Sequence, residues 1–570
     1  MSKRRNQKMK YRFRGFLLSA WSALVQSGPV RRMAGVRIVR IGIPVVVMLA
    51  DLFKNYLWHP GRRLFRRSLK FLRQREVLPW CITWIICGVL GFAICAHVIY
   101  MKIVIGLVLA ISFTLVCLRS SVSGLLLWVL LAPLMWCFLK LRLLPGLPLV
   151  SVDRLCLPIL IIAYLATAQR IRKAETNWPL HLTIGAYLLI VLLGSVRAVK
   201  PVSAFTSSVI DMLLPPITYM MARAWISNKS ALRWMFITYI IMGLYFAGMG
   251  IPEHFLGHGL VSRSGWVEKE LGTVRIQGPA SSPTDLGCIC ILSFVLLLAK
   301  FTQDKHGFRR ALYLVGMGIL ATAMVLTLRR AVYVSVPIAL LVMSIPRSRL
   351  RRPAVVLLSL LVLAVFIGWR PLVNSRVFKA RIGDMVPIYS RIIIQATAWS
   401  MVKQHPIFGV GMGNFKEVKY AYLTSYKGLN TVYGQGVETP HNAYLKLLAE
   451  GGIVALLPFL GMIFMIVFTS VKLFRRTRSE GLMGREGIVV FWAMTAVFLA
   501  QSFQGDAFYM LPSTCVAWFV FFGGIVGVHM RDEESTPVTE TAPAGRAQYQ
   551  SARRGRTFPG NAGYVNRKVE

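Results

Sequence analysis

Runs of apolar residues, each close to the length of a membrane span, recur along this chain between residues 78 and 529. A helix needs about 20 such residues to cross a bilayer core, and helices and closed barrels are the structures that satisfy their backbone hydrogen bonds in lipid. The sequence therefore predicts an all-α, polytopic integral membrane protein with about 12–14 transmembrane helices and a large extracytoplasmic loop. The candidate spans are 78–99, 103–118, 122–139, 150–168, 180–196, 203–224, 232–250, 285–300, 311–327, 331–346, 353–369, 452–471, 487–505 and 511–529.

The composition agrees with a membrane protein. Hydrophobic residues make up 55% of the chain and charged residues only 16%, too few to cover a soluble surface of this size. A formal net charge of +45 would suggest a nucleic-acid partner in a soluble protein, but here Lys and Arg cluster between apolar runs, so we expect none. The nine cysteines lie in or beside apolar stretches without a C-x-x-C pair, which predicts small buried side chains and no zinc site or disulfide framework.

The distribution of basic residues predicts the orientation. Residues 1–77 hold nineteen Lys and Arg against two acids, which favours a cytoplasmic arm. The opening residues imitate a signal peptide, but cleavage there would leave many cations to cross the membrane. Counted forward from the arm, four basic loops fall on the same side: 169–177, 300–310, 346–352 and 472–480. We therefore expect a multi-pass protein of the cell inner membrane with cytoplasmic N- and C-termini.

Five regions follow from this count. They are a basic cytoplasmic arm (1–77), a transmembrane bundle (78–369) with a periplasmic loop (251–284), a large periplasmic loop (370–451), C-terminal transmembrane helices (452–530) and a disordered cytoplasmic tail (531–570).

The large loop contains three recognisable segments. Residues 390–404 carry apolar residues at helical spacing, which predicts a helix lying on the membrane surface or packed on the bundle. The sequence HPIFGVGMGNF (405–415) imitates a nucleotide-binding glycine run, but no strand precedes it, so tight turns that bring the backbone close to another segment are favoured. In PHNAYLKLLAEGGI (440–453), Asn442 is expected to start a helix that continues into the next span.

Four motifs together carry a family resemblance. R-x-x-G-P followed by S-P-T-D-L, L-x-L-R-R-A, HPIFGVGMGNF and PHNAYLKLLAEGGI resemble the O-antigen ligase and O-antigen polymerase superfamily, over roughly residues 80–529. The resemblance implies a membrane glycosyltransferase with glycosyltransferase-C-type architecture. It also implies transfer of a saccharide from a polyprenyl-diphosphate carrier to an acceptor glycan or glycolipid hydroxyl at the periplasmic face, in lipopolysaccharide or exopolysaccharide biosynthesis. The family often has Ser where this chain has Arg329, so the arginine that meets substrate is left open between Arg329 and Arg330.

The chemistry of this transfer indicates which residue types are needed. A lipid diphosphate is already a good leaving group, so we expect no nucleotide, metal or other cofactor. A neutral histidine suits removal of the acceptor proton, which nominates His441 as catalytic base. Arginine suits the diphosphate charge because its planar fork pairs with phosphate oxygens, which nominates Arg275, Arg329 and Arg330.

Each nominated residue also has a purely structural explanation. His441 could cap a helix or bond a loop carbonyl, the arginine pair could extend to the membrane interface, and Arg275 could be a solvated charge. Arg391 and Lys403 could steer an anionic carrier or form a charged helix face.

Other polar residues leave further alternatives open. Glu450 could orient His441 or cap the loop. Asp211 lies within an apolar run, where a charge is often functional, or it could pair with a basic neighbour. Glu253, His254 and His258 could bind metal if helical, although Pro252 and Gly257 disfavour that.

A different class of function remains open, namely a transporter or flippase of lipid-linked oligosaccharides. That alternative predicts inverted repeats and charges near the bilayer midplane. No repeat is evident here, and the nominated residues lie in predicted outer loops.

Overall fold

The computed structural model describes residues 99–138, 140–141, 150–171, 178–207, 212–260, 269–270, 273–374, 385–505 and 511–534. All of them belong to one compact unit, Val89–Glu570. The predicted arm, the first apolar run, Asp211 and the tail beyond Glu534 lie outside the described residues.

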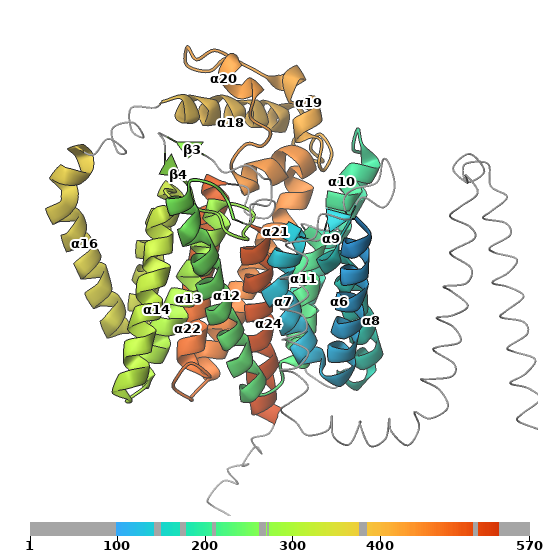
Figure 1. Ribbon diagram of the computed structural model, residues 1–570. Helices are drawn as coiled ribbons and strands as arrows, with labels where there is room; N and C mark the ends of the chain where they lie inside the picture. Colours follow the sequence, from blue (N-terminus) through green and yellow to red (C-terminus); the bar gives the residue numbers. More distant parts are fainter. Residues whose placement is uncertain are drawn as a thin grey trace, which may run out of the picture. The chain divides into compact units, whose positions relative to one another are not determined.

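Helices dominate the described residues of this unit, and the strands among those residues form two short antiparallel pairs (Figure 1). The prediction of an all-α polytopic membrane protein is confirmed, because eight helices in the described part of the chain are long and apolar enough to cross a membrane. These eight are α9 (Trp178–Val196), α12 (Lys229–Leu256), α13 (Pro283–Gln303), α14 (Gly307–Leu326), α16 (Arg351–Asn374), α21 (Ala443–Arg476), α22 (Arg485–Gln504) and α24 (Pro512–Glu534).

Shorter apolar segments lie in four more helices: α6 (Ile99–Arg119), α7 (Ser121–Phe138), α8 (Val152–Ile171) and α15 (Arg330–Ser344). The strand pairs are β1 (Lys140–Leu141) with β2 (Val150–Ser151), and β3 (Lys269–Glu270) with β4 (Thr273–Val274). The second pair directly precedes Arg275.

One predicted span contains two described helices. The apolar run 203–224 includes parts of α10 (Pro201–Ser207) and α11 (Leu214–Trp225), and residues 208–211 lie outside the described residues. Pro215 and Pro216 occupy the first turn of α11. Proline lacks a backbone N–H and its ring clashes with the preceding turn, so the pair favours the start of a new helix over continuation of an old one.

The centre of the bundle consists of α13, α22 and α24. Of the apolar window in α24, 83% is buried inside the protein, against 6% of the window in α16. Stacked aromatic rings join the central helices, with Phe498 and Trp518 centred 4.7 Å apart. Central helices such as α24 are apolar because they face other helices. Outer helices such as α16 are apolar because they face lipid.

Three basic loops gather at one end of the bundle, the lower end in Figure 1. Arg349, between α15 and α16, forms an ion pair with Glu480, between α21 and α22. The side chain of Gln303, at the end of α13, borders Gly481 in the same loop. This arrangement agrees with the expectation that the basic loops 300–310, 346–352 and 472–480 lie on the same side of the membrane.

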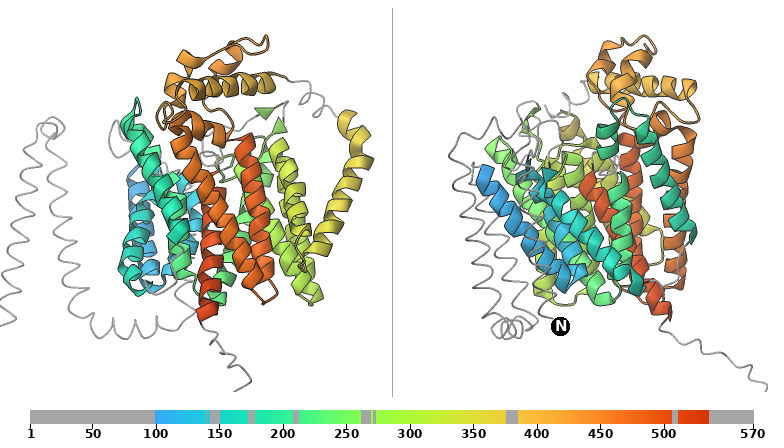
Figure 2. Two further views of the ribbon diagram at one scale, coloured as in Figure 1. Left: turned by 180° about the vertical axis from the view of Figure 1, so that it is seen from behind. Right: turned by 90° about the vertical axis from the view of Figure 1, so that its right-hand side faces the viewer.

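The large loop covers the opposite end, as all three views show (Figures 1 and 2). It contains α18 (Val386–Gln404), α19 (Phe415–Tyr422) and α20 (Val432–Gln435). The buried face of α18 packs against α19 and the start of α21. The core of this contact is Ile394, Ala398, Met401, Val402, Phe415 and Ala449.

Candidate active site

His441 has an unusual backbone at the start of α21. Its φ is 50°, in the left-handed region that non-glycine residues rarely occupy. The next residue, Asn442, caps the helix, and its side-chain oxygen accepts a hydrogen bond from the N–H of Leu445 at 3.0 Å. The prediction that Asn442 starts this helix is confirmed. Because Asn442 supplies the cap, the imidazole of His441 is not needed for it.

The turn between α14 and α15 presents Arg329 and Arg330. Leu328 in this turn also has a φ of 50°. Arg329 is half-buried and immediately precedes α15, whereas Arg330 begins that helix and is exposed. The amide of Gln501 in α22 donates to the carbonyl of Ala331 at 2.8 Å and to the hydroxyl of Ser335 at 2.6 Å. The first turn of α15 is thereby joined to the centre of the bundle.

His441 feels the charges of two arginines from distant segments, and a third arginine acts on one of these two. Burial lowers the pKa of His441, and the positive charges of Arg391 and Arg329 lower it further. Burial and the charge of Arg330 likewise lower the pKa of Arg391. Every charge that perturbs these two pKa values is positive. The site therefore holds a histidine that favours its neutral form within an electropositive environment.

Arg275 approaches the same turn from a third segment. The N–H of the next residue, Ile276, points to the carbonyl of Leu326 at 3.5 Å, three residues before Arg329. Arg275 is itself buried, with 8% of its surface exposed, so it is not the fully solvated charge of the structural alternative. The segment after β4 thus lies beside the arginine pair.

A buried carboxylate holds the segment that contains Arg275. Glu253 in α12 is fully buried, and its oxygens accept hydrogen bonds from the N–H groups of Gln277 and Gly278, each at 2.9 Å, and of Leu260 at 3.2 Å. His254 lies 3.3 Å, by its Nδ1, from the carbonyl of Val274. This role of Glu253 was not expected from the sequence, where the residue stood out only as a candidate metal ligand beside two histidines.

The predicted helix break near these histidines is only partly correct. Helix α12 runs through Pro252 to Leu256, and Gly257 then ends it with a φ of 70°, so His258 lies beyond the helix. Within the residues that the structure describes, no group of three or more His, Cys, Asp or Glu side chains is placed to hold a metal ion. Five described cysteines, at 117, 156, 288, 290 and 515, are buried, as expected.

The glycine-rich loop wraps around a break in α21. Gly452 has φ 65° and ψ −168°, and a Cβ there would collide with the carbonyl of Ile407. At the break, the N–H of Gly411 donates to the carbonyl of Glu450 at 2.8 Å, and the N–H of Ile453 donates to the carbonyl of Pro406 at 3.0 Å. The expectation that these glycines bring backbones close together is confirmed, and the neighbouring segment is α21.

Glu450 contacts this loop through its side chain. Its carboxylate accepts a hydrogen bond from the N–H of Phe415, the first residue of α19, at 3.0 Å. Of the two alternatives for Glu450, the structure displays the loop contact.

Asp285 of the S-P-T-D-L motif also joins separate segments through its carboxylate. It accepts hydrogen bonds from the hydroxyl of Ser281 at 3.0 Å and from that of Thr514, at the start of α24, at 2.7 Å.

Comparison with curated proteins finds no matching sequence. A family model described as O-antigen ligase matches residues 315–460. The matched range includes Arg329, Arg330, Arg391 and His441, and Arg275 lies outside it. The match confirms the resemblance for the motifs that lie within it: residues 315–460 of this chain are similar to the O-antigen ligase family.

Proposed function

We propose that the protein is a glycosyltransferase that moves a saccharide from a polyprenyl diphosphate to a hydroxyl of an acceptor glycan or glycolipid. The observation that carries the proposal is a partly buried histidine whose pKa is lowered by Arg391 and Arg329, with Arg330 acting in turn on Arg391. A diphosphate between these guanidinium groups would offset their mutual repulsion. The family match to O-antigen ligase supports the same class of reaction.

His441 is the proposed catalytic base. Because its pKa is lowered from the ordinary value of about 6.5, a larger fraction of the imidazole is neutral at neutral pH. A neutral imidazole accepts the proton of the acceptor hydroxyl as oxygen bonds to the anomeric carbon. The sugar–phosphate bond breaks in the same exchange, and the bond electrons leave with the diphosphate.

The arginines are the proposed diphosphate site. Planar guanidinium groups pair with phosphate oxygens through two parallel hydrogen bonds and keep their charge at all working pH values. Of the pair, Arg329 lowers the pKa of His441 and Arg330 lowers the pKa of Arg391, so both members are proposed to meet the donor. Arg275 is proposed to complete the site from the segment after β4.

The site is proposed to face the periplasm. It lies at the end of the bundle opposite the three basic loops, and basic loops favour the cytoplasmic side of an inner membrane. Reporter fusions after Lys305 and Arg478 are expected to give cytoplasmic signals, and a fusion after Lys427 a periplasmic one. A cytoplasmic Lys427 would place His441 on the wrong side for a donor displayed outside.

The direct test uses purified protein with a lipid-diphosphate saccharide and candidate acceptors, without nucleotide and with a metal chelator. We expect transfer to persist, because three or four guanidinium groups are available to stabilise the diphosphate. A single added block on a lipid A core acceptor indicates a ligase, and a ladder of products indicates a polymerase. Loss of activity that a divalent ion restores would contradict the metal-free proposal.

A transporter of lipid-linked oligosaccharides is the competing class, and it makes a different prediction in the same preparation. It would move the donor across a vesicle membrane and leave its covalent structure unchanged. Movement of intact donor, with no product on any acceptor, would overturn the transferase proposal.

A further inference from the structure

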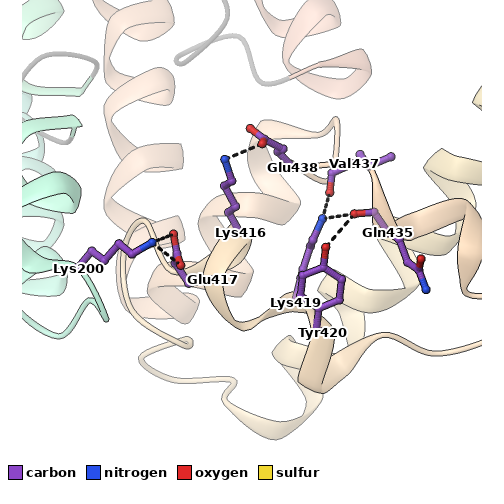
Figure 3. Close-up of polar contacts among 8 residues, drawn as sticks. All are labelled: Lys200, Lys416, Glu417, Lys419, Tyr420, Gln435, Val437 and Glu438. Atoms are coloured by element: carbon purple, nitrogen blue, oxygen red, sulfur yellow. Dashed lines mark hydrogen bonds and ion pairs between the residues drawn. The ribbon is translucent and has the colours of Figure 1, made fainter. Parts of the chain in front are cut away.

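A buried lysine holds the chain just before His441. Lys419 lies in α19 with 3% of its surface exposed. Its Nζ donates hydrogen bonds to the carbonyls of Gln435 at 2.7 Å and Val437 at 2.6 Å, as Figure 3 shows. The hydroxyl of Tyr420 donates to the carbonyl of Gln435 at 3.3 Å. We call the contact between Lys419 and these two carbonyls the Lys419 clamp.

Burying the charged Lys419 ammonium group costs free energy, so stability alone does not explain this contact. Burial lowers the pKa of Lys419, which records the cost of removing its charge from water. The two bonded groups are neutral carbonyls, so they satisfy the N–H donors without neutralising the charge. An apolar side chain would fill a buried position without that desolvation cost. The clamp's distinctive effect is to hold two specific backbone groups together.

Helix α19, which carries the clamp, is itself tied to α21 and to the bundle. The N–H of its first residue, Phe415, donates a hydrogen bond to the carboxylate of Glu450 in α21 at 3.0 Å. Asn414, directly before α19, accepts from the N–H of Val199 at 2.7 Å, and Lys200 pairs with Glu417 at 2.9 Å (Figure 3). The carbonyls held by Lys419 are thus fixed relative to the same helix that His441 precedes.

The chain between the clamp and α21 is held mainly by side-chain contacts, because Val437 packs on the core of the loop and Pro440 is buried. In the part of the protein that the structure describes, residues 438–441 form no backbone–backbone hydrogen bond. An exposed ion pair, Lys416 with Glu438 at 2.6 Å, is the contact shown there in Figure 3. His441 then adopts its left-handed φ, a conformation that persists only when the surroundings determine it. Those surroundings include the clamp and the buried Pro440 on one side and the Asn442 cap on the other.

We propose that Lys419 is a positioning residue for the transfer reaction, one that fixes the Gln435–Val437 backbone and thereby sets where the His441 imidazole lies against the arginines. The inference rests on the proposed function, in which His441 is the base. Lys419 does not touch the reacting atoms in this scheme. It acts on the rate because a base displaced by about 1 Å loses much of its effect.

The test compares Lys419→Met with Lys416→Met as its matched control. Both variants remove a lysine of α19 that bonds the segment before His441. Lys416 is exposed, however, and an exposed ion pair contributes little to stability. Turnover per folded molecule should fall about 10- to 100-fold in Lys419→Met and stay near wild type in Lys416→Met. Donor affinity should be unchanged in both, because the arginines lie on other segments. Lys419→Arg, which can still donate to the carbonyls, should recover part of the loss.

A double variant separates positioning from general damage to the fold. If Lys419 acts through His441, then adding Lys419→Met to His441→Asn should cause little further loss of turnover. Lys419→Met alone should also move the acidic limb of the pH–rate profile toward higher pH, because an imidazole that leaves the buried, electropositive site regains its ordinary pKa.

The possible outcomes are distinct. Normal turnover per folded molecule in Lys419→Met, with His441→Asn inactive, would overturn the positioning role and leave the proposed base intact. Additive losses in the double variant would also overturn it. A fully active His441→Asn would instead refute the base assignment on which the inference rests.

Discussion

His441 and Leu328 have the same backbone φ of 50°, and they lie on the two segments whose side chains meet at the site. Leu328 directly precedes Arg329, and Arg329 lowers the pKa of His441. A left-handed conformation costs a non-glycine residue about 1–2 kcal/mol, so each segment carries local strain where it presents a functional candidate. Strain of this kind is characteristic of sites in which side-chain direction matters more than local stability.

The first prediction uses this backbone conformation to design the test of the base. Asparagine tolerates the left-handed region better than most residues, so His441→Asn should fold as well as wild type. Turnover should nevertheless fall by about two to four orders of magnitude, the range for a lost general base, while donor affinity persists. His441→Ala should share the loss of turnover and give less folded protein. Specific activity and donor binding per folded molecule measure both effects, and normal turnover in His441→Asn would refute the assignment.

The second prediction concerns pH. A base must be neutral to accept a proton, so kcat/KM should rise with pH through the pKa of His441, and its midpoint should lie below about 6.5. Arg391→Gln removes one of the positive charges that lower this pKa, so the midpoint should move to higher pH. The move should be partial, because burial is the larger cause.

Lys403→Gln is the control for this pH experiment, since it removes a positive charge from the last turn of the same helix. The charge of Lys403 is not among the causes that shift the pKa of His441, so the midpoint should stay in place. Equal shifts in the two variants would show that the effect is not specific to Arg391.

The third prediction separates the charge-stabilising residues from the base. Arg330→Ala and Arg275→Ala should weaken donor binding as well as turnover, because a bound diphosphate meets their charge before the reaction begins. Lysine at either position should restore binding only in part, since a point charge cannot reproduce the guanidinium fork. Titration with a lipid-diphosphate saccharide checks this. Unchanged donor affinity in both alanine variants would remove the two arginines from the diphosphate site.

The fourth prediction tests the break in α21. Gly452→Ala should destabilise the protein by more than about 2 kcal/mol, because the new side chain meets the Ile407 carbonyl in a backbone conformation reserved for glycine. Gly461→Ala is the control within the same helix, where a Cβ would find only an ordinary contact with Thr183. That change should be neutral or stabilising by up to about 1 kcal/mol. Thermal unfolding of both variants in one detergent makes the comparison, and equal melting temperatures would contradict the proposed packing.

Several features of the fold follow from short stretches of sequence. The apolar runs predict helices because the length and hydropathy of a span are local properties. Pro215 and Pro216 likewise indicate the start of α11, because proline is tolerated in the first turn of a helix. The Asn442 cap and the turns at the glycines of HPIFGVGMGNF were predictable for the same reason, since capping and positive φ depend on the residue itself.

The arrangement of the site depended on contacts between distant segments. The sequence by itself nominated His441 and the arginines by residue type, but left open whether Arg329 or Arg330 belonged to the site and whether Arg391 served it. The tertiary structure brings all four into one electrostatic cluster, because α18 packs on α21 while the α14–α15 turn reaches the same end of the bundle. No local feature indicated the backbone contacts of Glu253 and Lys419, since each bonds backbone groups far along the chain or across a loop. Backbone groups are the same in every residue, so only the folded chain determines which of them a buried charge will meet.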